Sequence, residues 1–151
     1  MLNVNDIAVK VNLITNRLEW NIDVSNVKVF ILEDIDNSFY DGEYIYIKSN
    51  QSAINRELDL VHEYMHYIQS KGYRLSYTIS NIEDDYYRRR EEIDARLFTL
   101  LYVIDEFGIE GFNLLKDILI KGIDWQDINL RQAIKETKDK QLKELLTKEI
   151  V

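Results

Sequence analysis

Hydrophobic and polar residues alternate with a period of about two in parts of the first fifty positions, which predicts β-strands there. Residues 6–14 alternate weakly, and residues 26–32 are β-branched and mostly apolar, as in a central strand. Residues 43–48 alternate clearly behind the turn signal Asp41-Gly42. We therefore expect a small mixed sheet in this part of the chain.

From about residue 52 the apolar positions recur at helical spacing instead. Asn50 or Ser52 can cap the start of this helix, and Lys71-Gly72 ends it. Its core-facing positions are Leu58, Val61, Met65 and Ile68.

Three further helices are predicted, over residues 82–107, 109–121 and 125–150, and the last can break near Thr137. The first of them has the core stripe Ile93, Leu97, Leu100, Leu101 and Ile104. Strands followed by helices indicate an α+β fold, and the length predicts a single domain over residues 1–151.

Composition narrows the chemistry. The chain has 46% hydrophobic residues, enough for a real core, and no cysteine, so a metal would be held by histidine, carboxylate and water. A net charge of −8 argues against nucleic acid as a partner. No apolar run reaches the ~18 residues of a membrane span, and the N-terminus lacks the features of a signal peptide. We expect a cytoplasmic protein, and the sequence leaves its oligomeric state open.

The two histidines of the chain, His62 and His66, lie four residues apart in the motif H-E-x-x-H. On a helix this spacing places both imidazoles on one face, where they can reach a single ion. Glu63 is rotated by about 100° from His62 and flanks that ion. Zinc hydrolases use this arrangement, with the carboxylate taking a proton from the bound water.

A catalytic zinc site needs a third protein ligand, which must be a carboxylate here. The candidates are Glu91, Glu92 and Asp94 on the 82–107 helix. Asp94 falls among apolar residues, whereas Glu92 shares its face with the small residues Ala95 and Thr99. Periodicity alone does not choose among the three carboxylates.

Glu92-x-x-Ala95-x-x-Phe98-Thr99 downstream of H-E-x-x-H resembles the signature of the ImmA/IrrE-type and related minimal gluzincin metallopeptidases. Phage-borne and mobile-element proteins of this type often carry H-E-x-x-H-x-x-Q, and Gln69 stands at the corresponding position. The resemblance covers roughly residues 27–105.

The resemblance implies a zincin-like fold and a zinc metalloendopeptidase in which His62, His66 and Glu92 bind Zn²⁺ and Glu63 is catalytic. It also implies that the last strand, residues 43–48, lies at the edge of the cleft and pairs with an extended protein or peptide substrate. Gluzincins often supply an oxyanion donor as well, for which the candidates here are Tyr73, Tyr86 and Tyr87.

Asp59 lies one turn before Glu63, where it can orient a histidine or be an ordinary solvated helix residue. Two other function classes compete with the peptidase. In one, the chain is a non-catalytic zinc-binding module that docks a partner. In the other, it is a zinc-free helical interaction domain, and the histidine pair is accidental. Zinc content and the effect of Glu63→Gln separate these classes.

Overall fold

The computed structural model describes the backbone of residues 2–76, 84–120 and 123–150, with side chains from residue 89 onward in the second range. The chain divides into two compact units, unit 1 (Met1–Lys71) and unit 2 (Gly72–Val151), each with its own core. A single domain over the whole chain stays a prediction.

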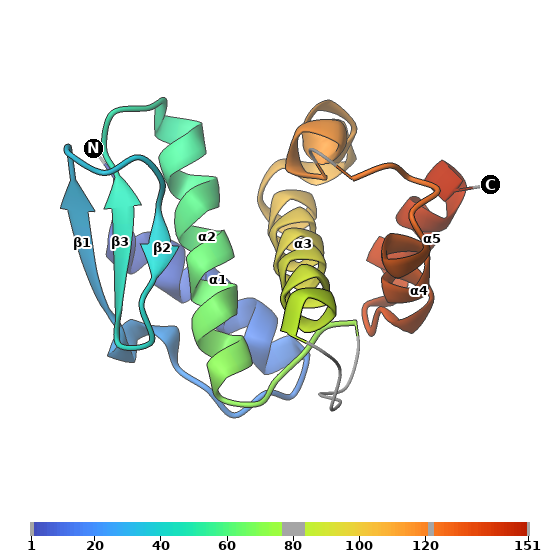
Figure 1. The fold of residues 1–151 in the computed structure, drawn as a ribbon, viewed down its shortest axis with the longest axis horizontal. Helices are drawn as coiled ribbons and strands as arrows, with labels where there is room; N and C mark the ends of the chain where they lie inside the picture. Colours follow the sequence, from blue (N-terminus) through green and yellow to red (C-terminus); the bar gives the residue numbers. More distant parts are fainter. Residues whose placement is uncertain (1, 77–83, 121–122, 151) are drawn as a thin grey trace. The chain divides into compact units, whose positions relative to one another are not determined.

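Unit 1 combines a three-stranded mixed sheet with two helices (Figure 1). In chain order its elements are α1 (Val4–Arg17), the 3-10 turn η1 (Val24–Asn26), β1 (Lys28–Leu32), β2 (Phe39–Tyr40), β3 (Tyr44–Lys48) and α2 (Ala53–Ser70). The strand order is β1-β3-β2, with β1 parallel and β2 antiparallel to the central strand β3. Helix α2 contacts β2 and β3, and α1 packs on α2.

The first segment corrects the sequence prediction, because residues 6–14 belong to helix α1 and not to a strand. Ile7, Val11 and Ile14 recur at helical spacing and are buried, which outweighs their weak alternation. The Asn3 side chain caps the helix by accepting from the backbone N–H of Asp6 at 3.1 Å. A helix therefore precedes the strands, contrary to the expected order.

The two predicted strands exist, but their places in the sheet are exchanged. The apolar strand expected at the centre is the edge strand β1, where Ile31 is 43% exposed. Residues 43–48, expected at the edge, contain the central strand β3, whose Ile45 and Ile47 are fully buried. The cause is the short strand β2, which folds back through a hairpin and covers the other side of β3.

The predicted Asp41-Gly42 turn is confirmed and forms this hairpin. The Asp41 carboxylate accepts from the backbone N–H groups of Glu43 and Tyr44 at 2.8 and 2.7 Å. These donors, that of Tyr44 foremost, hold the pKa of Asp41 below its usual value. Gly42 adopts a φ of 100°, which favours glycine.

Helix α2 also agrees with the sequence prediction. The Ser52 side chain accepts from the N–H of Asn55 at 3.2 Å and caps its start, and Gly72 follows its end with a φ of 97°. The predicted core positions are all buried, namely Leu58, Val61, Met65 and Ile68.

Unit 2 is helical, with α3 (Asp84–Leu119), α4 (Ile128–Glu136) and α5 (Lys140–Ile150). Helix α3 is interrupted at Gly108, which has φ 73° and ψ −171°, so the predicted break between residues 107 and 109 is confirmed. The break near Thr137 is confirmed too. Helix α4 begins later than predicted because Asp127 caps it, accepting from the N–H groups of Asn129 and Leu130.

The core of unit 2 lies where α3 meets α4 and α5, and the predicted α3 stripe is buried. Arg90 pairs with Glu136 at 3.0 Å and Arg89 pairs with Asp127, which ties α3 to α4. The α+β class is therefore confirmed, and none of the described helices is long and apolar enough to cross a membrane.

Candidate metal centre

Helix α2 brings the two histidines of the motif together. The Nε2 atoms of His62 and His66 lie 3.1 Å apart, with ring centroids 4.7 Å apart and the ring planes at 82°. Both side chains are half-buried. The two ring nitrogens therefore converge on one point beside the helix.

This distance suits a shared metal ion. Two nitrogens bound to one tetrahedral zinc at about 2.0–2.1 Å are separated by about 3.3 Å. The observed 3.1 Å between the Nε2 atoms is close to that value. Binding an ion would thus require little movement of either ring.

Gln69 contacts the far side of the second histidine. The Nδ1 atom of His66 lies 2.8 Å from Oε1 of Gln69, which is 3% exposed. An amide oxygen only accepts hydrogen bonds, so this contact pairs Nδ1 with an acceptor. The sequence offered one signal for this contact, since a spacing of three places Gln69 on the helix face of His66.

Glu63 follows His62 on helix α2 and is buried, with 7% of its surface exposed. Glutamate is rarely buried to this degree without a specific reason. A glutamate carboxylate can act as a general base toward water.

Asp59 was expected either to orient a histidine or to be a solvated helix residue, and its contacts show a third role. Its Oδ2 accepts from the hydroxyl of Ser38 at 2.6 Å and from Nε2 of Gln51 at 2.9 Å. Ser38 Oγ in turn accepts from the N–H of Lys48 at 2.9 Å. Asp59 therefore fastens the segments flanking β2 and β3 to α2, and orienting a histidine is not the role these contacts give it.

Two of the three carboxylates considered as the third ligand have structural roles within unit 2. Asp94 is fully buried and accepts from the N–H groups of Leu75 and Ser76 at 3.1 and 2.7 Å and from the Ser76 hydroxyl at 2.6 Å. Glu91 forms an ion pair with Arg74, which is 3% exposed. Both carboxylates hold the segment 74–76 against α3, and these contacts compete with metal binding.

Glu92 is the candidate that remains. It is half-buried on α3, one turn before the buried residue Ala95. The Thr99 hydroxyl donates to the backbone oxygen of Ala95 at 2.9 Å. This face of the helix therefore carries the short side chains of Ala95 and Thr99 next to Glu92. Glu92 belongs to unit 2 and the histidines to unit 1, and its role as a ligand stays a prediction.

The oxyanion donor also stays a prediction. The side chains of Tyr86 and Tyr87 lie outside the described residues. Tyr73 is half-buried in unit 2, and its backbone oxygen accepts from Nη1 of Arg74 at 3.0 Å.

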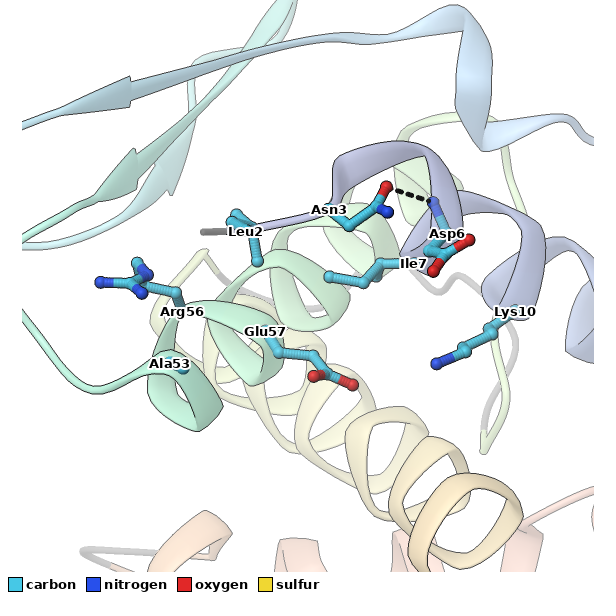
Figure 2. A pocket seen from close by; sticks show the side chains of 8 residues that line it. All are labelled: Leu2, Asn3, Asp6, Ile7, Lys10, Ala53, Arg56 and Glu57. Carbon is cyan, nitrogen blue, oxygen red and sulfur yellow. Dashed lines mark hydrogen bonds between the residues drawn. The ribbon is translucent and has the colours of Figure 1, made fainter.

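Unit 1 also has a pocket of about 160 Å³ where the starts of α1 and α2 meet, and its lining includes neither histidine (Figure 2). The side-chain ends of Lys10 and Glu57 point toward one another there. Arg56, at its rim, already donates to the backbone oxygens of Ser49 and Gln51. The pocket is lined by side chains of both charge signs, which do not indicate a particular ligand.

The histidine pair, with Gln69 in contact with His66, is therefore the candidate metal centre that unit 1 offers. Comparison with protein-family models, with curated proteins and with solved structures finds no match to this chain.

Proposed function

We propose that the protein is a zinc-dependent metalloendopeptidase of the gluzincin type with a zincin-like fold. His62, His66 and Glu92 hold the ion, and Glu63 is the general base. The observation that carries this proposal is the convergence of the two Nε2 atoms to 3.1 Å on a helix that also carries the buried residue Glu63.

The donor set supports zinc as the cofactor. The proposed ligands are the side chains of His62, His66 and Glu92. Two imidazoles and one carboxylate form a catalytic type of zinc site that leaves a fourth position for water. Nitrogen-rich sites of this kind favour zinc over magnesium or calcium.

Zinc held by His62, His66 and Glu92 would supply Lewis-acid chemistry that activates water for attack on the peptide carbonyl. Glu63 would accept a proton from the attacking water and return it to the amine that leaves when the peptide bond is cleaved. Its burial keeps the carboxylate away from bulk water, so the proton is passed within the site.

The edge strand β2 suits the binding of an extended peptide. It borders α2, because the Tyr40 ring packs edge-on against Tyr67 at 6.0 Å and its hydroxyl lies 3.3 Å from Oγ of Ser70. β-Strand addition at such an edge uses main-chain hydrogen bonds and accepts many side chains. A protein or peptide is the substrate class that the sequence resemblance favours.

Elemental analysis of protein purified without a metal-affinity tag tests the site. We expect about one mole of zinc per mole of chain, as three protein ligands would retain it. A value near zero that persists after zinc is added and the sample is dialysed would contradict the proposal.

Replacing the base tests the chemistry. Glu63→Gln should keep its zinc and lose about 10²–10⁴-fold or more of the hydrolysis of a random peptide pool, followed by mass spectrometry. Glu57→Gln, the same change on the same helix, is the control and should retain activity. Undiminished hydrolysis in Glu63→Gln would remove Glu63 as the base. Zinc binding without any hydrolysis in the wild type would favour the non-catalytic binding module.

A further inference from the structure

We infer that Gln69 is a positioning residue that sets the tautomer of His66. It holds the hydrogen of the neutral ring on Nδ1, so that the Nε2 lone pair is presented beside Nε2 of His62. The consequence for metal binding rests on the proposed function, whereas the tautomer itself does not.

Gln69 contacts the His66 ring directly. Its Oε1 atom lies 2.8 Å from Nδ1 of His66, a normal hydrogen-bond length. A neutral imidazole has one nitrogen that donates and one that accepts, and an amide oxygen has no hydrogen to give. The nitrogen that faces Oε1 must therefore be the donor.

The Gln69 side chain is buried. Because the residue is only 3% exposed, water does not readily replace its oxygen as the partner of Nδ1. Leaving an N–H group without its acceptor in such a place is unfavourable enough to make one tautomer predominate.

The tautomer also decides which nitrogen of His66 presents a lone pair. With the hydrogen on Nδ1, the lone pair is on Nε2, the atom that lies 3.1 Å from Nε2 of His62. Partners of a ligating histidine fix its ring and raise its basicity, and losing one typically weakens metal binding by about 10–100-fold. Unlike a carboxylate, Gln69 does this without adding charge.

The tautomer can be read directly by NMR, because the chain has two histidines and their ¹⁵N signals are easily assigned. We would label the histidines, remove metal with chelator and record spectra at about pH 8, above the ordinary histidine pKa of about 6.5. The variants are Gln69→Leu, which removes the acceptor, and Gln69→Glu, which keeps one. Gln132→Leu, at an exposed position of α4, is the matched control.

We expect the wild type, Gln69→Glu and Gln132→Leu to carry the His66 hydrogen on Nδ1, and Gln69→Leu to shift it to Nε2. Zinc affinity, measured by competition with a chromophoric chelator, should fall about 10–100-fold in Gln69→Leu alone.

A wild type with the hydrogen on Nε2 would overturn the inference without any variant, even where Gln69→Leu does not fold. An unchanged tautomer in folded Gln69→Leu would overturn it too. The expected tautomers in a protein that binds no zinc would support the role of Gln69 and overturn the metal site instead.

Discussion

At the scale of single residues, the buried carboxylates of this chain serve two different purposes. Asp94 accepts three hydrogen bonds from Leu75 and Ser76 and so holds a loop. Glu63 instead lies on the helix of the histidine pair, and the role proposed for it is that of a base. The role of a buried carboxylate is therefore indicated by its neighbours, and not by its burial alone.

This distinction predicts different defects for two changes on α3. Asp94→Ala should lower the free energy of unfolding by roughly 3 kcal/mol or more, because three buried donors lose their acceptor. Glu92→Ala should leave the unfolding of the metal-free protein within about 1 kcal/mol of wild type and reduce zinc affinity. Urea denaturation and chelator competition measure the two effects.

Glu91→Ala is the control for the ligand assignment. It should leave zinc affinity nearly unchanged while destabilising the protein, because Arg74 loses its partner in a buried place. If folded Glu91→Ala loses zinc and Glu92→Ala keeps it, Glu92 is not the third ligand.

The buried residue Tyr64, next to Glu63 in sequence, should make the stability of the protein depend on pH in the alkaline range. Burial, with a smaller effect of Asp23, raises the pKa of Tyr64 to about 12. An unfolded tyrosine ionises near 10, so this contribution to stability is complete below about pH 10 and is lost between about 10 and 12. The loss amounts to roughly 2–3 kcal/mol at the upper end.

The chain has ten tyrosines, so the informative quantity is the difference between wild type and Tyr64→Phe. Stability measured against urea at several pH values should fall less steeply above pH ~10 in the variant. Parallel curves for the two proteins would contradict the assignment.

At the scale of elements, α3 shows how one glycine divides a helix. Gly108 has φ 73° and ψ −171°, a conformation that is almost confined to glycine. The turn that follows is also tight, because a Cβ added at Gly111 would lie too close to the Cβ of Phe107. Backbone freedom at one position and close approach at the other make the kink possible.

Gly108→Ala should therefore lower the free energy of unfolding by about 1–3 kcal/mol through backbone strain alone, since open space surrounds its Cβ position. Gly111→Ala should also destabilise the protein, through the contact with Phe107. Asn113→Ala, at an exposed position of the same helix, should change stability by less than about 0.5 kcal/mol. Thermal unfolding of the three variants tests this, and an unaffected Gly108→Ala would contradict the strain.

At the scale of the whole molecule, the proposed ligands are contributed by α2 of unit 1 and α3 of unit 2. An ion that binds only the folded protein stabilises it by mass action. At free zinc about 100-fold above its dissociation constant, the gain is about 2.7 kcal/mol. The melting temperature should therefore rise with zinc and fall again with EDTA.

Glu92→Ala should show a smaller shift at the same zinc concentration, and Gln132→Leu should behave as wild type. A melting temperature that does not respond to zinc in the wild type would contradict the metal site as a whole.

The sequence by itself determined what depends on neighbours within a few positions. These features are the cap at Ser52, the end of α2 at Gly72, the interruption at Gly108 and the spacing that pairs His62 with His66. Helix ends, turns and i,i+4 pairs are local, so their residues indicate them directly.

Only the tertiary structure decided what depends on distant partners. Residues 6–14 form a helix because Ile7, Val11 and Ile14 are buried together, although their pattern also permits a strand. The strand expected at the centre lies at the edge because β2 folds back onto β3. Asp59 meets Ser38, 21 positions away, and Asp94 meets Ser76, 18 positions away. Such pairings arise from packing of the whole unit, and a periodic pattern carries no information about them.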